Sequence, residues 1–150
     1  MGAGQHRVFL NAFLLAAIGY GCLYGGIQWR RSRLGPWQVS FTQGEGGYPV
    51  VQINQHRLGI TNQELAFLTQ SGPVNPGTLS FVDPKPLPFE VPFGQCVFMD
   101  TTFLPGSVTL RLFGHTVELL PRTLIIDNRE HPWTTARRIE LKCSPGPCGR

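Results

Sequence analysis

The alternation of apolar and polar residues predicts strands over most of the chain. In the stretch WQVSFTQ, Trp37, Val39 and Phe41 alternate with polar residues, as in a strand with one buried face. The glycine-rich stretch GEGG follows, and YPVVQINQ then repeats the period of two with Val51 and Ile53 on one face. We therefore predict an antiparallel pair of strands joined by a loose, glycine-rich loop.

The next two stretches indicate a further strand and two short edge pieces. ITNQELAFLT fits a strand or a short helix capped by Thr61 with Glu64 three residues later, and the neighbouring strands favour the strand. The stretch SGPVNPGTLSFVDPKPLPFEVPFG contains six prolines. Because proline removes a donor from the ladder of hydrogen bonds, we expect only short edge strands here, within Thr78–Val82 and Phe89–Val91.

The stretch SVTLRLFGHTVELL is typical of a β-hairpin. A two-residue turn with Gly114 first and His115 second suits type II′ geometry, which prefers glycine at its first central position. In that register the apolar pairs lie on one face and a pair of opposite charge lies on the other. The opposed residues are then Phe113 with Thr116, Leu112 with Val117, Arg111 with Glu118, and Leu110 with Leu119.

The C-terminal third completes an all-β pattern. RTLIID continues or follows the second hairpin strand, whereas EHPWTTARRIELK fits either a short helix opened by Pro132 or a last strand in RRIELK. About seven or eight short strands separated by proline and glycine predict an all-β fold. Its expected architecture is an antiparallel β-sandwich or a partly open barrel.

One N-terminal transmembrane helix is expected before this body. Val8–Ile27 carries no charge over 20 residues, which as a helix is about 30 Å long and matches the core of a bilayer. A cleaved signal peptide and a lipoprotein acylated at Cys22 are the alternatives, but no A-x-A-like cleavage site follows. The predicted organisation is a tail at 1–7, a transmembrane helix at 8–29, a juxtamembrane segment at 30–36, a β-sandwich-like domain at 37–142 and a C-terminal tail at 143–150.

The charges around the helix bear on orientation and partners. Arg30, Arg31 and Arg33 follow the helix and Arg7 precedes it, which favours a cytoplasmic body. The short tail favours the opposite arrangement, and we expect the body on the extracytoplasmic side. Beyond these four arginines basic and acidic residues are equal in number, although the whole chain has a net charge of +4. The body therefore lacks the basic footprint of a nucleic-acid-binding protein.

The apolar helix also contains a stripe of small residues. Ala17, Gly21 and Gly25 recur every four residues and would lie on one face of the helix. Small residues at this spacing permit close approach of two membrane helices. This face is a candidate for homodimerisation, beside the bilayer itself and a protein partner as expected partners.

Residues with reactive side chains form no recognisable catalytic or metal-binding motif. Cys96 and Asp100, in CVFMDTT, have no basic residue nearby in sequence to activate the thiol, so they indicate a central strand, with both faces apolar, that runs into a turn. A site formed with His115 would need convergence through the fold. Cys143 and Cys148, separated by four residues, are a candidate disulfide but lack the second pair that a zinc site requires.

We therefore expect a membrane-anchored β-domain that acts as a non-enzymatic binding or structural module near the bilayer. The glycines of GEGG are followed by neither a helix pattern nor a phosphate-binding lysine, and no cofactor is predicted. Two alternatives remain: a hydrolase whose site is assembled from distant loops, and a carrier of a small apolar ligand. Convergent His, Asp and Cys side chains around a cavity lined by aromatic residues would favour these alternatives. A filled core with an exposed apolar patch would favour a binding module.

Overall fold

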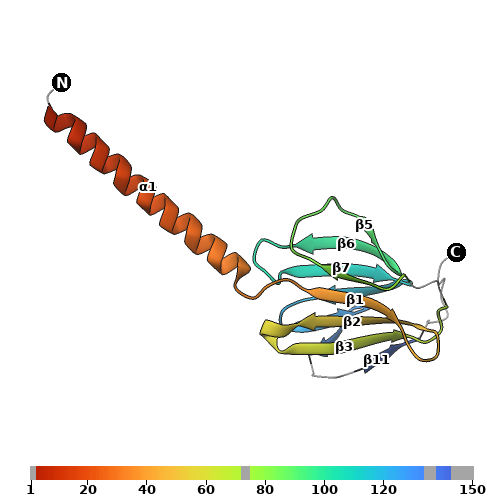
Figure 1. Cartoon of the computed structure of the whole chain (residues 1–150). Coiled ribbons are helices and arrows are strands. Elements are labelled where there is room, and N and C mark those ends of the chain that lie inside the picture. The colour runs from red at the N-terminus through yellow and green to blue at the C-terminus, as the bar shows by residue number, and fades with distance from the viewer. Residues whose placement is uncertain (1–2, 72–74, 134–137, 143–150) are drawn as a thin grey trace. The chain divides into compact units, whose positions relative to one another are not determined.

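The computed structural model describes residues 3–71, 75–133 and 138–142, which form two compact units divided between Arg33 and Leu34. The first unit contains one helix, α1 (Ala3–Ser32; Figure 1). Within its segment Gln5–Ser32, a window of 18 residues has a mean hydropathy of 1.7, so the helix is long and apolar enough to span a bilayer, as signal sequences also are. The helix therefore includes most of the expected N-terminal tail and the first part of the juxtamembrane segment.

The second unit is built from two β-sheets. The five-stranded sheet has the order β11-β3-β2-β1-β4, in which β11 runs parallel to β3 and the other pairs are antiparallel. The six-stranded sheet is an antiparallel meander, β10-β9-β8-β7-β6-β5. The strands and one short 3-10 helix are β1 Gln38–Gln43, β2 Pro49–Gln55, η1 His56–Leu58, β3 Ile60–Phe67, β4 Gly77–Ser80, β5 Phe89–Val91, β6 Gly94–Asp100, β7 Ser107–Leu112, β8 His115–Leu119, β9 Thr123–Ile126, β10 Arg129–Pro132 and β11 Arg138–Leu141.

The expected β-rich class is confirmed, and both sheets contribute to one hydrophobic core. Trp37, Val39 and Phe41 are fully buried, which confirms the alternation expected for β1. Rings connect the two sheets at one end of this core: Phe41 lies 5.5 Å from Phe93, and Phe93 lies 5.4 Å from Phe113 (centroid to centroid). Burying an apolar side chain of this size contributes about 1.5–3 kcal/mol to folding, so the core is the main source of stability.

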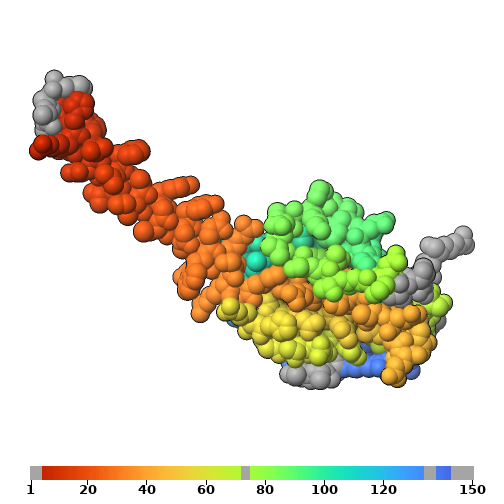
Figure 2. Space-filling model, viewed as in Figure 1, coloured from red at the N-terminus to blue at the C-terminus, as the bar shows by residue number. Residues whose placement is uncertain are grey.

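The proline-rich segment supplies one edge of each sheet, as expected. β4 is the edge of the five-stranded sheet and β5 is the edge of the six-stranded sheet. Phe81 follows β4, and its N–H donates to the carbonyl of Trp37 at 3.1 Å, which ties the segment to the start of β1. In Figure 2 the green surface of this segment and of β5 lies against the orange surface of β1.

Other stretches left open by the pattern are strands. ITNQELAFLT contains β3 and RRIELK contains β11, so neither is helical. Pro132 ends β10 instead of opening a helix. The hairpin β9–β10 was not expected and raises the strand number above eight. Its turn residues Asp127 and Asn128 have φ values of 49° and 64°, a conformation that Asn and Asp tolerate better than most residues.

The β7–β8 hairpin is present, but the expected register is wrong. The central turn residues are Phe113 and Gly114, both with positive φ (49° and 82°), which fits a type I′ turn better than the expected type II′ turn. Leu110 therefore pairs with Val117, and Arg111 pairs with Thr116 instead of Glu118. The ring of Phe113 packs 5.2 Å from Phe67 and also contacts Phe93, and these distant contacts stabilise an otherwise unfavourable backbone.

The inward face of this hairpin is nevertheless the expected one. Leu110, Leu112, Val117 and Leu119 are all fully buried, and Arg111 is exposed. The observed turn lies one residue earlier than expected, so every opposed pair changes while each residue keeps its face. The alternation of side chains within each strand thus holds although the pairing differs.

A bulge in β6 overturns the expectation that both faces of this strand are apolar and buried. The register between β6 and β7 shifts between Cys96 and Phe98, so Cys96 faces the core opposite Leu110 whereas Phe98 lies opposite Thr109. Cys96 is fully buried, but Phe98 is 49% exposed. The extra residue places Phe98 on the outer face of the sheet. In a strand without a bulge, Phe98 would lie on the same face as Cys96.

Candidate functional site

A histidine and an aspartate from neighbouring strands meet at the end of the six-stranded sheet that carries the β7–β8 turn. His115 is the first residue of β8, and Asp127 follows the last residue of β9. Because β8 and β9 pair with Val117 opposite Ile126, the two residues lie beyond the same end of the ladder. The N–H of Asp127 also donates to the carbonyl of Thr116 at 2.9 Å, which fixes the turn.

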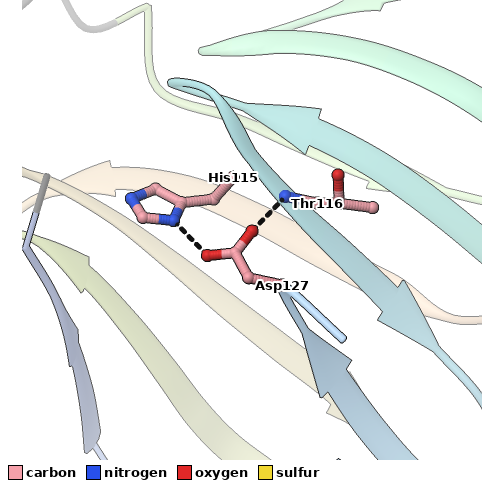
Figure 3. A network of polar contacts seen from close by, with 3 residues as sticks. All are labelled: His115, Thr116 and Asp127. Atoms are coloured by element: carbon pink, nitrogen blue, oxygen red, sulfur yellow. Dashed lines mark hydrogen bonds and ion pairs between the residues drawn. The ribbon is translucent and has the colours of Figure 1, made fainter. Parts of the chain in front are cut away.

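The Asp127 carboxylate makes two contacts (Figure 3). One oxygen, Oδ2, lies 2.6 Å from Nδ1 of His115, and the other, Oδ1, accepts the backbone N–H of Thr116 at 2.9 Å. The His115 side chain is 13% exposed and its ring lies 5.9 Å from that of Phe67, whereas Asp127 is 47% exposed. A carboxylate at Nδ1 favours the tautomer with the proton on that nitrogen, which leaves Nε2 as an acceptor.

An imidazole oriented in this way can accept a proton or bind a metal ion, but chemistry needs further groups. In the part of the chain that the structure describes, the partner of His115 Nδ1 is Asp127, and the Cys96 thiol donates elsewhere, to the carbonyl of Phe98. No group of three or more potential metal ligands occurs in these residues. In the observed geometry the pair connects β8 to the β9–β10 turn.

Cys96 does not approach this pair. Its sulfur donates a weak hydrogen bond to the carbonyl of Phe98 at 3.4 Å, and burial raises the pKa of the Cys96 thiol. A raised pKa keeps the sulfur protonated, the opposite of what a nucleophile requires. Cys96 faces Leu110 on β7, two positions along that strand from Leu112, which pairs with His115.

Asp100 lies at the other end of β6. It pairs with Ser107, and its Oδ1 accepts the backbone N–H of Thr102 at 2.9 Å. This bond and one from the Thr102 hydroxyl lower the pKa of the Asp100 carboxyl. The contact confirms the expected strand end, whose aspartate bonds to the following backbone. The three candidates Cys96, Asp100 and His115 thus occupy three separate places in the six-stranded sheet.

Sequence reasoning missed Asp127. Its only local signal is the dipeptide Asp127–Asn128 after an apolar run. This dipeptide indicates a turn but does not identify a partner for the Asp127 carboxylate. Proximity to His115 follows from the pairing of β8 with β9, which the sequence pattern did not establish. Cys143 and Cys148 lie outside the described residues. Their bridge stays a prediction, as does dimerisation through Ala17, Gly21 and Gly25 on α1.

A shallow groove, the β4–β5 groove, lies where the two edge strands approach each other. It encloses about 210 Å³ including its open mouth, and it is lined by Leu79, Ser80, Phe81, Asp83, Lys85, Phe89 and Met99. Apolar side chains form most of its lining, and the ammonium of Lys85 lies 5.2 Å from the centre of the Phe89 ring. The lining thus combines apolar side chains with the opposite charges of Asp83 and Lys85.

The fold and these surfaces define a β-rich unit that follows one long apolar helix. Comparison with protein-family models, curated proteins and solved structures finds no significant match to this chain.

Proposed function

We propose that the chain is a single-pass membrane protein that carries a non-enzymatic binding module. In this proposal residues 8–29 of α1 cross the bilayer, and the two sheets form a β-sandwich on the extracytoplasmic side. The length and hydropathy of α1 support the first part. The core that draws residues from both sheets, with rings in contact between them, supports the second.

The observation that carries the binding role is the separation of the reactive side chains around a filled core. Ring contacts join Phe41 to Phe93, Phe93 to Phe113 and Phe113 to Phe67, and this mutual packing favours a filled core over the cavity of a carrier. The pair of His115 with Asp127 is what favours a hydrolase, and the Cys96 thiol donates to the carbonyl of Phe98 and not to this pair. A surface that recognises another molecule is the remaining role that this geometry supports.

The β4–β5 groove is the proposed contact surface, and an extracytoplasmic protein segment with an apolar side chain next to an acidic one is its proposed occupant. Val82 beside the groove is 39% exposed, and Lys85 offers a positive charge at the rim. An edge strand such as β5 also has backbone groups free to pair with an added strand. Apolar contact and charge would then act together in recognition.

Site-specific photocrosslinking in native membranes tests this surface. A photoreactive phenylalanine analogue at Val82 should give one discrete protein adduct, whereas the same analogue at Arg129, exposed on the opposite edge strand β10, should not. Lys85→Glu should abolish the adduct while the fold persists, because Lys85 is exposed and its one described ring contact is with Phe89 at the rim of the core. Equal adducts from both positions, or an adduct unaffected by Lys85→Glu, would contradict the proposed surface.

Carbonate extraction tests the anchor separately. The full chain should remain with the membrane pellet, because an uncharged helix of this length is stable only in the hydrocarbon core. A chain that begins at Leu34, the first residue of the second unit, should be soluble. Release of the full chain by carbonate would refute the anchor and leave the groove experiment unaffected.

A further inference from the structure

The start of the β unit is held by an unusually well-connected side chain. Nε2 of Gln55, at the end of β2, lies 3.0, 2.8 and 3.2 Å from the carbonyl oxygens of Leu34, Gly35 and Pro36. Its Oε1 accepts the backbone N–H of Arg57 at 2.9 Å. Gln55 is only 3% exposed, so this clamp belongs to the folded interior.

The clamp leaves little free chain between the two units. α1 ends at Ser32, and Gln55 already holds the carbonyl of Leu34, so only Arg33 separates the helix from the clamped backbone. If residues 8–29 span the bilayer, Leu34 follows the end of the span by five residues, or at most about 18 Å of extended chain. The part of the β unit around Leu34 therefore lies within about 18 Å of the end of the span, close to the lipid headgroups.

We call the end of the β unit that contains Leu34 the proximal end, and strand register identifies loops that lie there. Gln38 begins β1 and pairs with Asn54, so the β2–β3 connection, which contains η1, lies at the end where the chain arrives. The indole N–H of Trp37 donates to the carbonyl of Gly106 at 3.1 Å, which places the β6–β7 loop there. The β8–β9 connection lies there as well, because Trp133, whose ring is 5.3 Å from that of Trp37, donates to the carbonyl of Leu120 at 2.8 Å.

These three proximal loops present an aromatic ring and two positive charges. Phe103, in the β6–β7 loop, is 58% exposed, which is more than Val82, Leu87 or Phe98 elsewhere in the β unit. Arg57 in η1 and Arg122 in the β8–β9 connection are both exposed. Asp100, which precedes the β6–β7 loop, is engaged by the backbone of Thr102. The β4–β5 connection begins at the same end, because Ser80 pairs with Gln38, and it carries the exposed opposite charges of Asp83 and Lys85.

The β6–β7 loop is rigid enough to hold an exposed ring in place. Asp100 fixes its start through Thr102, and the bond from Trp37 fixes its end at Gly106. Gly106, at φ 68°, approaches the carbonyl of Asp100 so closely that a Cβ would lie 1.8 Å from that oxygen. Phe103 is thus presented from a loop closed at both ends, and exposure of an apolar ring costs free energy unless another surface covers it.

We infer that the proximal loops form a lipid-binding face: Phe103 inserts between the headgroups of the same bilayer that α1 crosses, and Arg57 and Arg122 bind lipid phosphates. Aromatic rings favour this interfacial zone, and arginine binds phosphate through paired N–H groups. The inference rests on the proposed membrane span. Its consequence is that the β unit is held against the lipid surface and is not free to move away from it.

Quenching by brominated lipids tests this face with the full chain in nanodiscs. The discs contain phosphatidylcholine with or without phosphatidylglycerol, brominated on the acyl chain near the headgroup. The tryptophan added by Phe103→Trp should lose most of its emission, measured as the difference from the parent chain. The matched control Glu45→Trp, exposed in the β1–β2 loop at the opposite end, should keep its emission. Charge reversal by Arg57→Glu with Arg122→Glu should reduce the quenching, most strongly in discs with phosphatidylglycerol.

Native Trp29 on α1 separates the two proposals. Its emission, isolated by comparison with Trp29→Phe, is quenched if α1 crosses the disc. Quenching of Trp29 without quenching at position 103 overturns the lipid-binding face and leaves the span intact. Equal quenching at positions 103 and 45 also overturns it, because the contact is then not confined to the proximal end. Absence of quenching at all three positions refutes the span itself. Circular dichroism of each variant verifies the fold.

Discussion

Replacement of Gly106 by alanine should be far more destabilising than replacement of Gly114, although both residues have positive φ. Gly106 has φ 68° and Gly114 has φ 82°, so each alanine is forced into the left-handed region. That conformation alone costs about 1–2 kcal/mol for a residue with a Cβ. Gly114 has no heavy atom within 4 Å of an added Cβ, so Gly114→Ala should cost only this amount.

At Gly106 the added methyl group collides with backbone. The Cβ would lie 1.8 Å from the carbonyl oxygen of Asp100, so the ends of β6 and β7 must move apart. This movement removes the terminal pair of Asp100 with Ser107 and the bond from the Trp37 indole to Gly106. Each lost hydrogen bond costs about 1 kcal/mol, and more where a buried donor is left unsatisfied. We expect a total loss of about 3–5 kcal/mol for Gly106→Ala.

Denaturant unfolding of the full chain in detergent micelles measures both costs. Tryptophan fluorescence follows the β unit, because Trp37 is fully buried beside Gly106, while circular dichroism verifies that the helix persists. A domain of this size has about 5–15 kcal/mol of stability, so the loss at Gly106 is a large fraction of it. Equal losses for the two alanines would refute the argument, since they would show that the close approach of the two backbones contributes nothing.

Three further predictions concern the six-stranded sheet. Leu112→Asp should prevent folding because it buries an unpaired charge. Arg111 is exposed, so Arg111→Ala should change the free energy of unfolding by less than about 0.5 kcal/mol. Protease resistance and thermal melts distinguish the two variants. Cys96→Ala should cost about 1–2 kcal/mol, and the native Cys96 thiol should resist labelling by a bulky reagent; rapid labelling would contradict its burial. The lowered pKa of Asp100 means that its stabilising contribution is complete above the ordinary carboxyl pKa and is lost as the pH falls through the folded-state value. Asp100→Asn should therefore reduce the acid sensitivity of unfolding, measured by melts between neutral and acidic pH.

Local periodicity was sufficient to assign the faces of strands. The alternation at Trp37, Val39 and Phe41 identifies the buried side of β1, because successive side chains of any strand point to opposite faces. The same logic identified the inward face of the β7–β8 hairpin even though its turn was misplaced. Prolines likewise predicted the edge positions of β4 and β5, since a missing N–H is tolerated best on the side of a strand that pairs with no other strand.

Contacts between residues distant in sequence decided the register and the bulge. Phe113 occupies the turn of the β7–β8 hairpin because its ring packs against Phe67 and Phe93, and no local rule favours an aromatic residue there. The shift between Cys96 and Phe98 depends on the pairing of β6 with β7, and it turns an apparently buried ring outward. Turn conformers and bulges differ by only a few kcal/mol, so packing against remote elements can select among them.

The candidate surfaces depended even more on tertiary structure. His115 gained Asp127 as a partner only through the pairing of β8 with β9, and Gln55 gained its three carbonyl partners only when the chain returned beside Leu34. The sequence alone indicated a long apolar helix and a β-rich body, because hydrophobicity and its period are properties of neighbouring residues. Which polar groups meet, and which loops of the body gather at the same end of its sheets, are long-range properties that only the folded chain establishes.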